Sequence, residues 1–103
     1  MGYGADGTFN DVVNIDYQGG VVTVGTSQTI AAANGSSNLE GRQEVIIYNK
    51  SSNTVYFGPT GVTTSTGIPI DPKETINIQF GAEIDVYLIA GSADNDVIVQ
   101  EAA

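Results

Sequence analysis

The fold is decided by the stretch Glu44–Phe80, which reads EVIIYNKSSNTVYFGPTGVTTSTGIPIDPKETINIQF. It contains three segments rich in β-branched and aromatic residues, namely EVIIYNK, TVYFG and ETINIQF. Such residues favour the pleated, half-buried surface of a strand. The last segment alternates strictly, so that Ile76, Ile78 and Phe80 face one side. Side chains with a period of two predict a strand that buries one face, and no helical period is present.

Turn signals separate these segments at hairpin spacing. Ser51-Ser52-Asn53 is a polar connection between the first two segments. Asp71-Pro72-Lys73-Glu74 precedes the third, and Pro72 suits the second position of a tight turn. Between them, Gly58–Pro69 is rich in Gly, Thr and Ser and predicts a long exposed connection. The alternation of short strands and turns is typical of an antiparallel all-β domain.

Further strand-like segments flank this region. They are Val21–Val24, Glu83–Ala90 and Asp96–Glu101, with Gly91–Asn95 as a hairpin loop between the last two. Thr29–Ala33 fits either a strand end or one helical turn. Six or seven short strands at this spacing predict a small antiparallel β-sandwich that is jelly-roll-like. We expect this domain to span residues 20–103 and an extended arm to span residues 1–19.

Composition argues against an enzyme. The chain of 103 residues has the size of one domain, and it contains no Cys, His or Trp. It therefore lacks the usual zinc and copper ligands and the commonest general base. We expect no catalytic activity, no metal and no cofactor. No apolar run reaches bilayer length, and the first residues lack the basic and apolar parts of a signal peptide.

The net charge of −9 is unevenly distributed. Residues 1–40 carry −4 and residues 81–103 carry −5, whereas residues 41–80 are neutral. Because nucleic acids and anionic membranes attract basic surfaces, we expect neither as a partner. A basic protein is the natural complement. The alternative is that the charge only keeps the protein soluble.

Several strands are apolar on both faces. A two-layer sandwich buries only one face of each sheet, so a second set of apolar residues is left over. We expect this set to form an oligomer interface, although loops could cover it instead. Its strand tyrosines could alternatively stack on sugar rings. The interface residues predicted in this way are Ile46, Tyr48, Tyr56, Tyr87 and Ile89.

The N-terminal arm combines glycines with alternating apolar residues. Its candidate anchors are Phe9, Val13, Ile15 and Tyr17. We expect the arm to order on a partner by strand addition, whereas a frayed terminus is the alternative. Near the other terminus, Asp94-Asn95-Asp96 places oxygen ligands close together in sequence. These residues could hold a hard cation, but a polar hairpin turn explains them better.

The order of these segments resembles a short β-domain of tailed-phage virion proteins. The resemblance rests on TIAAA at Thr29–Ala33, Arg42, VIIYN at Val45–Asn49, VYFG at Val55–Gly58 and GIPI at Gly67–Ile70. It continues through the Pro turn, the alternating strand, VYLIA and VIVQE, and covers about Val22 to Glu101. It extends to capsid decoration proteins and to tail or fibre components. The acidic N-terminal extension and the loop NGSSNLEG depart from the pattern.

The resemblance implies a virion structural protein that acts by binding. We expect a capsid decoration protein that is made in the host cytoplasm and binds the major capsid protein at the capsid surface. By analogy with the threefold positions of an icosahedral shell, we expect a homotrimer. The alternative is a receptor- or glycan-binding module of a tail or fibre. The loops Gly58–Gly67 and Gly91–Asn95 carry no aromatic residue, which argues against a glycan site.

Overall fold

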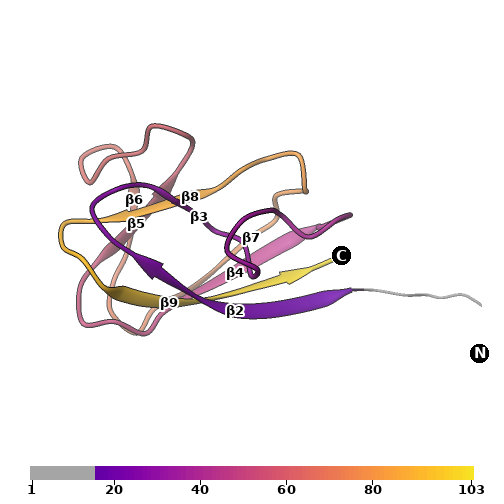
Figure 1. Cartoon of the computed structure of the whole chain (residues 1–103), viewed down its shortest axis with the longest axis horizontal. Coiled ribbons are helices and arrows are strands. Elements are labelled where there is room, and N and C mark those ends of the chain that lie inside the picture. The colour runs from indigo at the N-terminus through magenta and orange to yellow at the C-terminus, as the bar shows by residue number, and fades with distance from the viewer. Residues whose placement is uncertain (1–15) are drawn as a thin grey trace, which may run out of the picture.

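The structure is a computed structural model that describes residues 16–103. These residues form eight strands and no helix (Figure 1). The strands are β2 (Tyr17–Val24), β3 (Thr29–Ile30), β4 (Glu44–Asn49), β5 (Val55–Gly58), β6 (Ile68–Ile70), β7 (Thr75–Ile78), β8 (Tyr87–Ala90) and β9 (Asn95–Ala102).

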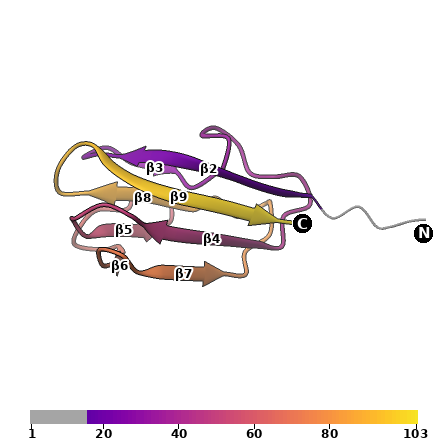
Figure 2. The same cartoon turned by 90° about the horizontal axis from the view of Figure 1, so that it is seen from below.

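The strands form two antiparallel sheets of four, which lie face to face (Figures 1 and 2). The front sheet has the order β2-β9-β4-β7 and the back sheet has the order β3-β8-β5-β6. Among the strands of residues 16–103, β5 and β6 are the one pair of neighbouring strands that are also successive in the chain; every other pair of successive strands is divided between the two layers. This is the double-sheet arrangement of a jelly roll, so the predicted all-β sandwich is confirmed.

The core lies between the sheets and follows from strand alternation. In β4, Val45 and Ile47 point inward, and in β9, Val97 and Val99 do the same. The register places Ile47 opposite Val99, so apolar side chains from neighbouring strands pack in rows. Leu88 of β8 closes the core from the back sheet.

Three segments differ from the sequence-based expectation, and a fourth decides between two alternatives. The strand β2 begins at Tyr17, so residues 17–19 belong to the sheet and not to the arm. Residues Ile68–Ile70 form the short strand β6 inside the expected connection. Of the two alternatives for Thr29–Ala33, the structure has the strand, at Thr29–Ile30. The expected strand Glu83–Ala90 is shorter, since β8 begins at Tyr87 and Ile84 is exposed in the turn before it.

The loop between β5 and β6 folds back over the back sheet. A Cβ atom placed on Gly58 would lie 2.7 Å from Val62 Cγ2, so Gly58 allows the loop to approach closely. Val62 is buried by this contact. At the tip of the loop, Gln28 Oε1 accepts a hydrogen bond from the Gly61 amide at 2.7 Å. The outer face of the back sheet is therefore partly covered by the chain itself.

Candidate docking site

A buried ion pair lies at the end of the sandwich where β9 terminates. The Nη1 atom of Arg42 is 2.9 Å from Glu101 Oε2, and the residues are 2% and 0% exposed. Glu101 also accepts hydrogen bonds from the Ala33 amide at 2.8 Å and the Leu39 amide at 3.0 Å. Both oxygens of the buried carboxylate therefore accept hydrogen bonds, which is what a buried charge requires.

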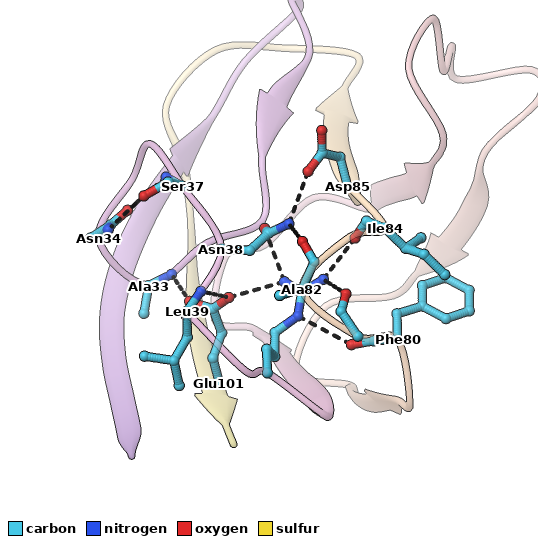
Figure 3. Close-up of polar contacts among 12 residues, drawn as sticks. Ala33, Asn34, Ser37, Asn38, Leu39, Phe80, Ala82, Ile84, Asp85 and Glu101 are labelled. Atoms are coloured by element: carbon cyan, nitrogen blue, oxygen red, sulfur yellow. Dashed lines mark hydrogen bonds and ion pairs between the residues drawn. The ribbon is translucent and has the colours of Figure 1, made fainter.

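The other donors of Arg42 hold the loop between β7 and β8. Nε donates to the Phe80 carbonyl at 3.1 Å, and Nη2 donates to the Gly81 and Ile84 carbonyls at 3.0 and 2.7 Å. Asn38 adds a bond from Nδ2 to the Ala82 carbonyl at 2.9 Å (Figure 3). A planar guanidinium with five donors suits this role, because it binds several carbonyls in fixed directions.

The loop fixed in this way carries one wall of an apolar groove. In Figure 3, the side chains of Phe80 and Ile84 project from the loop on the side away from Glu101. We call this cavity of about 350 Å³ the docking groove. Phe57, Gly58, Pro59, Thr66, Ile68, Phe80, Ile84, Asp85 and Val86 line it. Its lining comes from the end of β5, the start of β6 and the loop between β7 and β8.

Acidic side chains surround the same end of the molecule, which we call the acidic end. Asp16 precedes β2, Glu44 begins β4 opposite Ala102, and Glu83 and Asp85 lie on the loop that Arg42 holds. Glu40 lies in the turn just before Arg42. The only basic residue at this end is Arg42, which is buried and paired. Within residues 16–103, no ion pair other than Arg42–Glu101 is formed.

The opposite end is held by a neutral polar cluster. Asn49 is buried and donates from Nδ2 to the Asn53 and Ile70 carbonyls, both at 2.8 Å. Asn95 is also buried and donates to the Ser92 carbonyl at 2.7 Å. The two exposed lysines of the described chain lie here, since Lys73 Nζ donates to the Lys50 carbonyl.

The candidate cation ligands do not converge. The Asn95 side chain points inward, and its Oδ1 accepts from Asn53 Nδ2 at 2.9 Å. Asp96 points outward, where its Oδ1 accepts from Thr23 Oγ1 at 2.8 Å. Asp94 has a positive φ of 63°, which is typical of a turn residue. In residues 16–103, no group of three acidic side chains is placed to hold a metal ion.

The five predicted interface residues lie on opposite faces of the sandwich. Ile46 and Tyr48 of β4 are on the outer face of the front sheet. Tyr56 of β5 pairs with Ile89 of β8 on the outer face of the back sheet, and Tyr87 shares that face. All five are partly buried. The predicted set is therefore divided between two separate outer faces, and an oligomer interface at these residues stays a prediction.

Of the four predicted arm residues, the structure describes one. Phe9, Val13 and Ile15 lie outside the described residues. Tyr17 is the first residue of β2, pairs with Ala102 and donates a hydrogen bond from its hydroxyl to Gln100 Oε1. Its place in an ordered sheet differs from the role of arm anchor that the sequence suggested.

The groove and the ion pair that supports it were not predicted from the sequence. One signal for the support was available, since Glu101 continues the inward series of Val97 and Val99. A carboxylate on a buried face demands a cationic partner. Arg42 is the only arginine in the chain and was the natural candidate.

Residues 16–103 thus form a helix-free sandwich with an apolar groove, and Arg42 binds the loop that forms one wall of this groove. Comparison with protein-family models, curated proteins and solved structures found no match. Among residues 16–103, no helix is long and apolar enough to cross a membrane.

Proposed function

We propose that this chain is a structural protein of a tailed-phage particle, and that it acts as a capsid decoration protein by binding the shell. The family resemblance in the sequence carries this proposal. The double-sheet jelly roll supports it, because viral capsid domains use this architecture. A fold alone assigns no function, so the surfaces that the chain presents must also fit the proposed role.

Self-association is part of the proposal, and the outer face of the front sheet is the best surface for it. Val21, Ile98 and Tyr48 lie directly opposite one another across β2, β9 and β4. Four strands spaced by about 4.8 Å and six residues rising by about 3.4 Å each give a face of about 400 Å². Two copies would bury about 800 Å², so the unpaired edge of β2 is needed to reach the roughly 1,000 Å² of a stable interface.

The predicted trimer is retained as an expectation from the shell symmetry. The two outer faces lie on opposite sides of the sandwich, and this limits how three copies can contact one another. Copies stacked front face to back face form an open filament, whereas a closed ring needs contacts that turn through a fixed angle. The back sheet is also partly covered by the loop that buries Val62. We therefore assign the contact between copies to the front sheet and the edge of β2.

The arm is proposed as the second contact with the shell. Phe9, Val13 and Ile15 are its anchors, by the sequence argument alone. A deletion that tests them must end at residue 15, because Asp16 accepts a hydrogen bond from the Ala103 amide and β2 begins at Tyr17. The shortened chain should keep its fold and lose capsid binding.

The test is co-sedimentation of the purified chain with emptied capsids and, separately, with host cell envelopes. Binding to capsids that saturates at a fixed copy number supports the decoration role. Binding to envelopes alone, or a reproducible hit on a glycan array, favours the second candidate. That candidate is a receptor- or glycan-binding module of a tail or fibre, since lectin domains also use jelly rolls.

A further inference from the structure

The exposed large apolar side chains of the described residues gather in two places. Tyr17 and Val21 belong to β2, at the front sheet. Ile68, Ile84 and Phe80 are 59%, 48% and 38% exposed, and all three line the docking groove. Exposed apolar patches of this kind mark interaction sites, because water contact with them is unfavourable.

We propose that the docking groove binds a basic segment of another protein. One apolar side chain of that segment enters the groove, and Lys or Arg residues beside it contact Asp85 and Glu83. The groove volume of about 350 Å³ is at the lower end of the roughly 300–1,000 Å³ of ligand pockets, and it accommodates a large side chain.

The acidic side chains beside the groove favour a positively charged partner. Asp85 lines the groove, and Glu83 is exposed two residues away on the same loop. Among residues 16–103, no exposed basic residue lies at the acidic end, so no cation neutralises these carboxylates; Asp85 Oδ1 accepts one neutral hydrogen bond, from Asn38 Nδ2 at 2.8 Å. Nucleic acid and fatty-acid anions are repelled, whereas a cationic segment is attracted to the groove and oriented by it.

The backbone geometry favours recognition through side chains. The edge strand β6 beside the groove contains Pro69, which has no amide hydrogen to give to an added strand. The loop wall, by contrast, is fixed before binding by the three carbonyl contacts of Arg42. A preformed wall lowers the entropy that binding must overcome.

Fluorescence anisotropy with short labelled peptides tests the proposal. The probe has a central Leu flanked by two Lys on each side. Changing its Leu to Ser should weaken binding about tenfold or more, since burial of one Leu side chain is lost. Changing its lysines to Glu should abolish binding. These assays use no phage particle, so their outcome is independent of the virion assignment.

Variants of the chain locate the contact. Ile84→Ser should weaken binding about tenfold, whereas Ile89→Ser makes the same change on the outer face of the back sheet, away from the groove, and should leave binding unchanged. Glu83→Gln combined with Asp85→Asn should weaken binding at least threefold at low salt, with a smaller effect at high salt. The control for this double variant removes two negative charges at the opposite end of the sandwich.

That control is Asp71→Asn combined with Asp94→Asn. Its effect on the peptide affinity should be less than half of the effect of Glu83→Gln combined with Asp85→Asn. Circular dichroism of each variant checks that the fold is intact. Amide shifts on peptide addition should concentrate in Gly58, Ile68 and residues 80–86. Equal binding of the Ser peptide, no loss in Ile84→Ser, or tighter binding of decanol than of the peptide would each overturn the proposal.

Discussion

Removal of Arg42 should be the most damaging single change at the acidic end. In Arg42→Met, the Glu101 carboxylate stays buried but loses its only cationic partner. The carbonyls of Phe80, Gly81 and Ile84 lose their donors as well. Breaking a buried pair by removing one partner costs about 3–5 kcal/mol. The two backbone amides that still bind Glu101 place the expected loss at about 3 kcal/mol rather than 5.

Urea unfolding followed by circular dichroism measures this loss. For a slope of about 1–3 kcal/mol/M, a loss of 3 kcal/mol lowers the midpoint by about 1–3 M. Lys50→Met is the matched control, because it removes one positive charge from an exposed residue whose side chain makes no ion pair. It should change the free energy of unfolding by no more than about 0.5 kcal/mol.

Arg42→Lys serves as the second variant in case Arg42→Met does not fold. Lysine keeps the charge for Glu101 but cannot reach three carbonyls in the fixed directions of a guanidinium. We expect an intermediate loss of about 1–2 kcal/mol, since each hydrogen bond contributes about 0.5–1.5 kcal/mol. Amide exchange should rise in residues 80–85 of this variant. A loss below about 1 kcal/mol in Arg42→Met would refute the assigned role of the ion pair.

Two further changes test packing and association. Gly20→Ala should destabilise the fold by about 2 kcal/mol or more, because its Cβ would lie 2.2 Å from the Ala33 carbonyl oxygen; Gly25→Ala, with its nearest contact at 3.9 Å, is the control in the same urea assay. Tyr48→Asp should dissociate the oligomer in light scattering, whereas Tyr87→Asp on the opposite face should not. Equal effects of the two tyrosine variants would contradict the assignment of the interface to the front sheet.

Most strands could be predicted because their patterns are local. The alternation in Thr75–Ile78 and the apolar runs of β4 and β8 need no distant partner to be recognised. β6 was missed because it has only three residues, of which Ile68 and Pro69 are exposed, and because Pro is unusual within strands. β2 was predicted too short because Gly19 and Gly20 favour a turn in isolation, whereas pairing with β9 keeps them extended.

The groove could not be predicted because it depends on contacts between distant segments. Alternation continues through Phe80 in the sequence and assigns its side chain to the core. In the structure β7 ends at Ile78, and the Phe80 carbonyl is bound by Arg42, which lies 38 residues away along the chain. A strand pattern holds no information about such a contact. For the same reason, the sequence could not show that the five predicted interface residues are divided between two opposite faces.

The buried ion pair stabilises the exposed loop more than it stabilises the core. An apolar pair of similar volume would fill the space of Arg42 and Glu101 at equal or lower free energy, because it avoids the desolvation of two charges. Such a pair could not bind the carbonyls of Phe80, Gly81 and Ile84, which now accept hydrogen bonds from the guanidinium. The apolar side chains of Phe80 and Ile84 would then collapse toward the core or move freely in solvent. The cost of burying the two charges is therefore offset by a loop that keeps its apolar side chains exposed and in place, as a binding groove requires.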